Sequence, residues 1–216
     1  MNIFQIICLL LSIAAAITHL VFIYKNHKLG RQISKGFITG ILLLYIVFSK
    51  EKSVFLYFGL IASFVGDILL LFKEKKIFFI FGAIAFSLAH ISYFIVTTKV
   101  LPANFNWCYY GIVLLLGYLV VEFIRKYLKK SFGKLSIPAA IYFYLVGTVI
   151  LNLLCGTLFN FSIVSFVALI GSLCFIASDI ILSINYFIKK IKYGEFIIML
   201  LYSLAQVLIV VPIIFV

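Results

Sequence analysis

Long apolar runs separated by short charged clusters constrain this chain more than any other feature. Of its 216 residues, 66% are hydrophobic and 11% are charged, whereas an ordinary soluble domain has about 25% charged residues. A helix needs about 20 mainly apolar residues to cross a bilayer, and strands of membrane barrels are shorter and alternate in polarity. We therefore expect an all-α membrane protein with eight transmembrane helices in one domain, residues 1–216. The eight runs are 3–24, 33–49, 54–72, 77–98, 107–124, 136–157, 162–186 and 195–215.

The basic residues predict how these helices are oriented. Of the 18 Lys and Arg residues, 15 fall in the first, third, fifth and seventh loops, and only Lys50, Lys52 and Lys99 fall in the others. Basic loops stay in the cytoplasm, so both termini are expected on the extracytoplasmic side of a multi-pass protein, in a bacterial cytoplasmic membrane. Because the charges lie in clusters between apolar runs, the net charge of +12 does not indicate nucleic-acid binding.

Two pairs of similar segments indicate an internal repeat. The segment "GLIASFVGD" (59–67) resembles "GSLCFIASD" (171–179), at an offset of 112 residues. The segment "FSLAH" (86–90) resembles "YSLAQ" (202–206), at an offset of 116. Chance similarity between apolar helices is the competing explanation, because such helices share a small set of residue types.

The repeat predicts two parallel halves of four helices each, residues 1–103 and 104–216. An even number of spans gives both halves the same orientation, related by an axis along the membrane normal. We therefore expect Asp67 and Asp179 to lie near each other across the bundle, flanked by His90 and Gln206.

Polar residues inside the apolar runs are the candidate functional groups. An acidic residue at the centre of a membrane helix costs about 2.5–3.5 kcal/mol, and such residues usually face the bundle interior or a water-filled cavity. Asp67 shares a helix face with Ser63, and His90 shares one with Tyr93. Hydrogen bonding between helices is the structural alternative for each of them. Four further polar residues are expected to be structural or interfacial: His19, Glu122, Asn152 and Glu195.

A pair of buried carboxyl groups favours acid–base chemistry. Burial and mutual repulsion keep one carboxyl group protonated while the other is ionised, which provides a general acid and a general base. This chemistry suits hydrolysis of a lipid ether, and it equally suits a small proton-coupled transporter. The sequence contains no GxSxG, HExxH, P-loop or dinucleotide motif. No spacing requires a metal or another cofactor, and the four cysteines, all inside apolar runs, predict no disulfide.

The ordered set of motifs resembles the YhhN/TMEM86 family. Four segments carry the resemblance: "SFVGDILLLF" (63–72), "FGAIAFSLAHISY" (81–93), "FIASDIILSINYF" (175–187) and "YSLAQ" (202–206). The resemblance implies a lysoplasmalogenase, which hydrolyses the vinyl-ether bond of a lysoplasmalogen to a fatty aldehyde and glycerophosphoethanolamine or glycerophosphocholine. It implies no cofactor, and its expected partners are this lysophospholipid and the bilayer. The same chemistry on another lipid stays open.

Matching the motifs residue by residue gives the expected site. The resemblance implies Asp67, Asp179 and His90 as catalytic residues. The expected substrate-binding residues are Ser63, Lys35, Tyr93, Asn185, Tyr202 and Gln206. Asn185 lies near the cytoplasmic end of its helix, so capping is a competing role. The family often has Lys-Pro where this chain has Lys35-Gly36, although Lys35 is still placed to meet a lipid phosphate.

Overall fold

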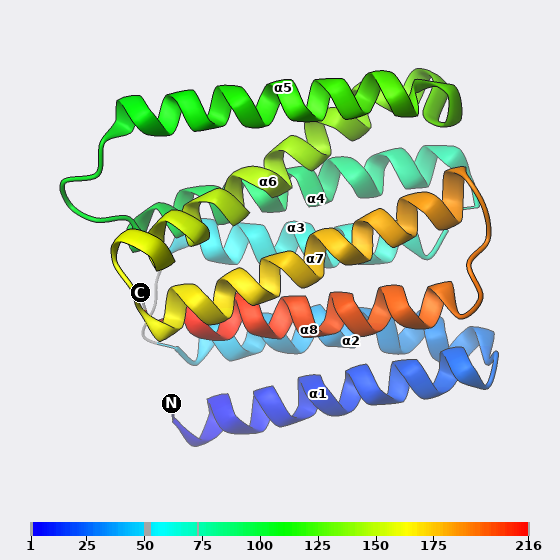
Figure 1. The fold of residues 1–216 in the computed structure, drawn as a ribbon. Helices are drawn as coiled ribbons and strands as arrows, with labels where there is room; N and C mark the ends of the chain where they lie inside the picture. The colour runs from blue at the N-terminus through cyan, green and yellow to red at the C-terminus, as the bar shows by residue number, and fades with distance from the viewer. Residues whose placement is uncertain (1, 50–52, 73, 216) are drawn as a thin grey trace.

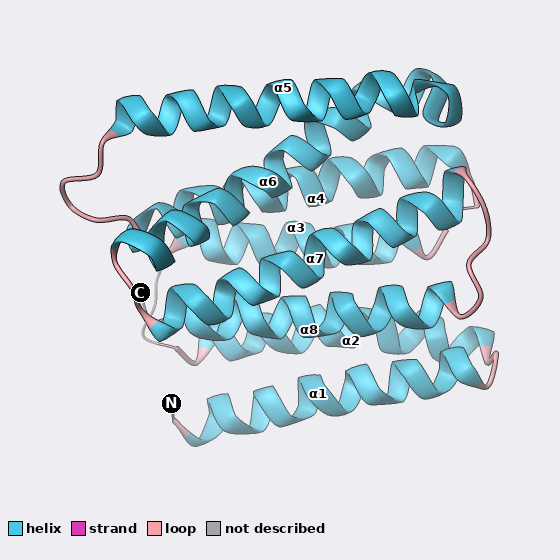
Figure 2. Ribbon diagram, viewed as in Figure 1, coloured by secondary structure: helices cyan, strands magenta, loops and turns pink. Residues whose placement is uncertain are grey.

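The computed structural model describes residues 2–49, 53–72 and 74–215. All regular secondary structure in this part of the chain is helical, with eight α-helices joined by loops (Figures 1 and 2). Their bounds are α1 Ile3–Tyr24, α2 Lys28–Val47, α3 Val54–Leu70, α4 Lys76–Thr97, α5 Trp107–Phe132, α6 Ser136–Phe159, α7 Ile163–Phe187 and α8 Gly194–Ile213. A short 3₁₀ segment, η1 Thr98–Val100, follows α4. A second one, η2 Gly133–Leu135, lies between α5 and α6. The predicted all-α class is confirmed.

Two helices extend beyond the apolar runs that predicted them. Helix α2 begins at Lys28 rather than at residue 33, because the His27 ring caps it by accepting a hydrogen bond from the Gly30 amide at 2.9 Å. Helix α5 continues to Phe132 rather than ending at residue 124. There, Glu122 and Arg125 form an ion pair one helical turn apart. Apolar runs therefore locate the helices, but polar turns lengthen them.

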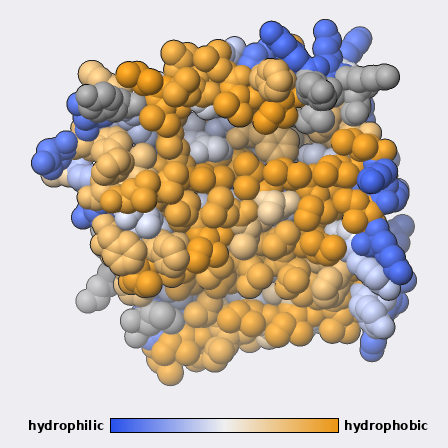
Figure 3. Space-filling view, in the orientation of Figure 1, coloured by the Kyte–Doolittle hydropathy of each residue, from blue (hydrophilic) through white to orange (hydrophobic). Residues whose placement is uncertain are grey.

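The hydropathy of the helices is consistent with an integral membrane protein. Five helices in the described part of the chain, α1, α4, α6, α7 and α8, are long and apolar enough to cross a bilayer. Helix α3 has 17 residues and is shorter than that standard, while α2 and α5 carry basic residues at one end. A broad apolar surface covers the middle of the molecule, with hydrophilic residues toward its ends (Figure 3). The count of eight spans and the orientation of the termini stay predictions.

The helices form a bundle with two distinct ends. Both termini lie at one end, and the α1–α2, α3–α4, α5–α6 and α7–α8 connections lie at the other (Figure 1). We call the second end the basic end, because these connections and the adjoining turns carry the clustered Lys and Arg residues. Helices α3 and α4 pack closely as a hairpin, as do α7 and α8, whereas α5 lies at the edge, mainly against α6.

Both close hairpins cross at a glycine. A Cβ atom on Gly59 of α3 would lie 2.8 Å from the Tyr93 ring of α4, and one on Gly171 of α7 would lie 2.9 Å from the Ile209 amide nitrogen of α8. Tyr93 and Ile209 are 116 residues apart, the same offset as the "FSLAH" and "YSLAQ" motifs. Both hairpins thus have a close glycine contact at positions related by the motif offsets, while α3 and α4 make equally close contacts at Gly66 and Gly82. The internal repeat stays a prediction.

Candidate functional site

Asp67 of α3 and Asp179 of α7 line one polar cavity at the basic end of the bundle. The cavity has a volume of about 170 Å³. Helices α2 and α8 complete its walls with Lys35 and Tyr202. Further lining residues include His19, Lys28, Arg31, Glu74, Phe86 and Glu195. Two carboxyl groups that lie 112 residues apart in the chain thus reach the same small volume.

Asp67 is surrounded by donors and a cation. Its side chain is 1% exposed, and its Oδ2 accepts hydrogen bonds from the Thr39 hydroxyl at 3.0 Å and the Tyr202 hydroxyl at 2.7 Å. The Lys35 ammonium lies 3.6 Å from its Oδ1. Charge-assisted hydrogen bonds and a nearby cation stabilise the ionised form of a carboxyl group. These donors and the cation stabilise a carboxylate at Asp67 against the desolvation that its burial imposes.

Gln206 extends this hydrogen-bond network by one helical turn. Its amide nitrogen donates to the Tyr202 hydroxyl at 3.0 Å, and that hydroxyl donates to Asp67. Tyr202 lines the cavity, whereas Gln206 lies outside the described lining. Gln206 therefore reaches the carboxylate only through Tyr202 and fixes the direction of its hydroxyl group.

Asp179 has a different environment from Asp67. Its Oδ2 accepts a hydrogen bond from the Tyr142 hydroxyl of α6, and the structure gives it no ion pair within the described residues. Its neighbours in the lining include Phe86 and Leu182. An apolar setting disfavours the charged form of a carboxyl group. This environment favours a protonated Asp179, the form that can donate a proton.

His90 lies behind the cavity, in an aromatic cluster. Its Nδ1 lies 2.8 Å from the Phe86 carbonyl oxygen, which only accepts, so Nδ1 carries the proton. The ring contacts Phe175 and Tyr142, with centroids 4.7 Å and 5.8 Å away. The side chain is 2% exposed and is outside the described cavity lining. Tyr142 therefore links His90 to Asp179, because it packs on the imidazole and donates to the carboxyl group.

Besides Gln206, three of the expected binding residues lie away from the cavity walls: Ser63, Tyr93 and Asn185. The Ser63 and Tyr93 hydroxyls lie 3.3 Å apart at the α3–α4 contact. The Asn185 Oδ1 accepts a hydrogen bond from the Ile191 amide at 2.9 Å, which fixes the α7–α8 connection. That contact is the capping role that the position of Asn185 near its helix end had suggested.

The mouth of the cavity carries charges of both signs. Arg31 of α2 donates to Glu195 of α8 at 2.7 Å, and Lys28 and Glu74 line the same region. His19 accepts or donates at 2.8 Å with Ser34, which joins α1 to α2. His19 and Glu195 were expected to be structural or interfacial. Both make contacts between helices, and both also line the cavity. Within the described residues, no three His, Cys, Asp or Glu side chains cluster as metal ligands would.

Thr39 and Tyr142 were missed in the sequence. Each lies on the second helix of its half and donates a hydroxyl group to the aspartate on the third helix. Thr39 belongs to a mainly apolar helix, and Tyr142 is one of 13 tyrosines, so neither stands out. Their symmetric relation to the two aspartates was the available signal, but it depends on knowing which helices meet.

Comparison with known proteins identifies the family. The model of the YhhN family matches residues 30–213, a range that includes every residue of the site described above except His19 and Lys28. The searches of curated proteins and of solved structures gave no match. The family match agrees with the resemblance carried by the four motifs. This chain belongs to the YhhN family.

Proposed function

We propose that this protein hydrolyses the vinyl-ether bond of lysoplasmalogens within the membrane. The products are a fatty aldehyde and glycerophosphoethanolamine or glycerophosphocholine. Membership of the YhhN family is consistent with a hydrolase. One observation carries the proposal further: two aspartates line the same cavity in opposite environments.

The two environments correspond to the two roles in acid–base catalysis. If Thr39 and Tyr142 are equivalent, then Lys35, four residues before Thr39, corresponds to Pro138, four residues before Tyr142. One half of the repeat therefore places a cation beside its aspartate, and the other half places an apolar ring at that position. We assign Asp179 as the general acid and Asp67 as the carboxylate base.

The reaction begins with transfer of the Asp179 proton to the β-carbon of the vinyl ether. The resulting oxocarbenium ion is stabilised by the Asp67 carboxylate, which then takes a proton from the attacking water. The hemiacetal collapses as Asp179 recovers a proton from its hydroxyl group and Asp67 returns a proton to the departing glycerol oxygen. Both aspartates regain their starting states, and the net change is the addition of one water.

His90 and Tyr142 contribute to this reaction by holding the Asp179 carboxyl group in place. Tyr142 holds the Asp179 carboxyl group through its hydroxyl group, and the His90 ring packs against Tyr142. The hydrogen bond from His90 Nδ1 to the Phe86 carbonyl fixes the orientation of the imidazole. We infer that His90 is a positioning residue, which changes the rate through Tyr142.

The cavity mouth suits the phosphate of the head group. Lys28, Arg31 and Lys35 are presented from successive turns of α2 toward one region. Guanidinium and ammonium groups bind phosphate through charge-assisted hydrogen bonds, and basic residues near a membrane surface attract anionic groups. A phosphate bound there leaves the ether bond of the same lipid on the inner side, toward the aspartates.

Aldehyde release from a purified sample tests the proposal. Wild-type protein in detergent is given a lysoplasmalogen beside Asp67→Asn and Asp179→Asn, with Glu122→Gln on α5 as the matched control. Loss of a general acid or base lowers rates by about 10²–10⁴-fold, so both Asn variants are expected to be inactive while the control is unaffected. No aldehyde from folded wild-type protein would contradict the proposal and favour proton-coupled transport. Full activity of either Asn variant would contradict the assigned roles.

A further inference from the structure

A second, apolar chamber borders the polar cavity at Asp179. The chamber lies between α4, α6 and α7 and has a volume of about 380 Å³. The two spaces share four lining residues: Leu70, Phe86, Asp179 and Leu182. Asp179 is the only acidic residue in the described lining of the chamber, and most of the rest is aliphatic or aromatic. The assigned acid therefore stands at the boundary between a polar space and an apolar one.

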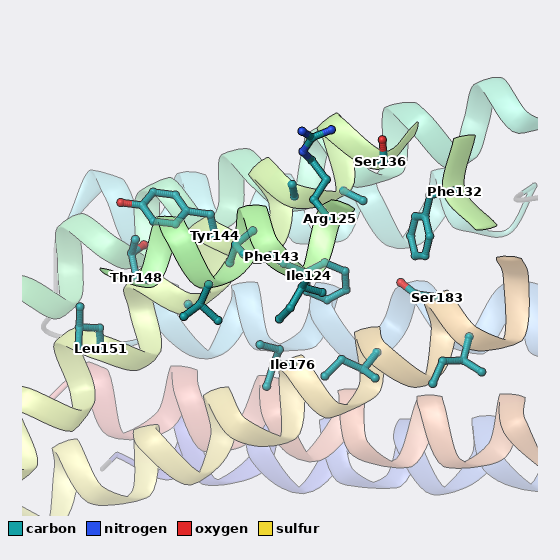
Figure 4. Close-up of a pocket in the computed structure, with 18 of the residues that line it drawn as sticks. Ile124, Arg125, Phe132, Ser136, Phe143, Tyr144, Thr148, Leu151, Ile176 and Ser183 are labelled. Carbon is teal, nitrogen blue, oxygen red and sulfur yellow. The ribbon is translucent and has the colours of Figure 1, made fainter. Parts of the chain in front are cut away.

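A larger hollow than the chamber lies nearby and does not reach the aspartates. A groove of about 650 Å³ lies between α5, α6 and α7 (Figure 4). It borders the apolar chamber, with which it shares Phe132, Ala139, Phe143 and Ser183. It shares no described lining residue with the polar cavity, and neither Asp67 nor Asp179 lines it. The groove has the larger volume, but the smaller chamber is the one that Asp179 lines.

We propose that the apolar chamber binds the single hydrocarbon chain of the substrate and sets its preferred length. This inference rests on the proposed function, because a vinyl ether joins the chain to the polar glycerol and must lie where the two spaces meet. Volumes of about 300–1,000 Å³ are typical of small-molecule sites, so the chamber can hold one chain. The chain then lies in the chamber, the head group lies in the cavity, and Asp179 faces the bond between them.

Ala83 of α4 is the position at which to shorten the chamber. It lines this chamber and neither of the other two spaces, and its side chain is half-buried. Ala140 of α6 is a matched control, since it is also half-buried but lines only the separate groove. Phenylalanine at either position adds the same side-chain volume, but it fills part of the chamber in one variant and part of the groove in the other.

The experiment compares long-chain and short-chain choline lysoplasmalogens as substrates of the full-length protein in one detergent. A mismatch in a hydrophobic pocket changes selectivity by about 10–200-fold. Ala83→Phe is expected to lower the ratio of long-chain to short-chain kcat/KM at least about tenfold, whereas Ala140→Phe keeps the wild-type ratio. An unchanged ratio in Ala83→Phe, or an equal shift in Ala140→Phe, would overturn the inference. If Ala83→Phe does not fold, Ala83→Leu replaces it in the same comparison.

A binding measurement separates this inference from the proposed reaction. A saturated alkyl-ether lysophospholipid has the same shape but no vinyl ether to hydrolyse. Long-chain preference in its binding to wild-type protein, lost in Ala83→Phe, supports the chamber even if no aldehyde is ever released. Equal long-chain affinity in wild type and both variants would overturn the inference that the chamber binds the hydrocarbon chain, without contradicting the proposed reaction.

Discussion

The two aspartates differ because the side chains around them differ, although their helices correspond. Asp67 has Lys35, Thr39 and Tyr202 beside it. Asp179 has the Tyr142 hydroxyl and an apolar wall. In the proposed mechanism, two carboxyl groups with unequal surroundings provide both an acid and a base at one pH.

Replacing Lys35 by Met tests whether the base depends on its cation. A hydrogen bond or ion pair to a charged group contributes about 1.5–3 kcal/mol, so kcat/KM is expected to fall about 10- to 100-fold. Lys35→Arg keeps the charge and is expected to retain more activity than Lys35→Met. Equal activity of Lys35→Met and wild type in the aldehyde assay would show that the ion pair with Asp67 has no part in the reaction.

Replacing Tyr142 by Phe tests how the acid is positioned. The change removes the hydroxyl group that donates a hydrogen bond to Asp179, and it keeps the ring that packs on His90. We expect kcat to fall about tenfold with little change in KM, since loss of one hydrogen bond to a reacting group costs about 1.5 kcal/mol. Tyr144→Phe is the control on the same helix, because its hydroxyl bonds the Leu114 carbonyl. A larger effect of the control would mean that the α6 fold, not Asp179, is affected.

Close contacts between neighbouring helices position the two aspartates. Gly59 and Gly171 bring α3 against α4 and α7 against α8, and each of these hairpins carries one aspartate of the pair. Small residues at helix contacts let backbones approach closely in membranes. The depth of each carboxyl group in the bundle therefore depends on a glycine two turns away.

Gly171→Ala is expected to destabilise the protein. Its new Cβ would meet the α8 backbone 2.9 Å away, and a backbone moves less readily than a side chain. Overpacking of this kind costs about 1–3 kcal/mol, which a lower unfolding temperature in detergent would reveal. Gly147→Ala on α6 is the control, because nothing lies within 4 Å of its Cβ position. Similar unfolding temperatures for both variants would contradict the close crossing.

Over the whole molecule, the basic end and the site lie together. The charged mouth of the cavity is formed beside the α1–α2, α3–α4 and α7–α8 connections. If the basic loops are cytoplasmic, the head group of the substrate is bound from the cytoplasmic leaflet.

Reporter fusions test this orientation. A reporter that is active only outside the cytoplasm is expected to be active after the C-terminal residue and inactive in the α7–α8 connection. The reverse pattern would place the cavity mouth on the extracytoplasmic side. An odd number of crossings between the termini would contradict the prediction of eight spans.

Much of this architecture could be predicted from hydropathy and charge. The apolar runs located all the described helices, and the matched motifs indicated that Asp67 and Asp179 meet. Periodicity could not show that Ser63 and Tyr93 bond each other, because this depends on the distance between α3 and α4. The capping contact of Asn185 is local, and its position near a helix end had already suggested it. The helix ends at Lys28 and Phe132 were missed because polar turns outside the apolar core continue a helix.

Hydrolysis in heavy water measures the central step directly, because a proton transferred from Asp179 to carbon would appear as deuterium in the aldehyde. The proposed mechanism transfers one solvent-derived proton from Asp179 to the β-carbon of the vinyl ether. In D₂O the wild-type protein should therefore release an aldehyde with a single deuterium on the carbon next to the carbonyl, and Asp179→Asn should release none. Aldehyde from the wild type without that deuterium, or labelled aldehyde from Asp179→Asn at the wild-type rate, would contradict the mechanism.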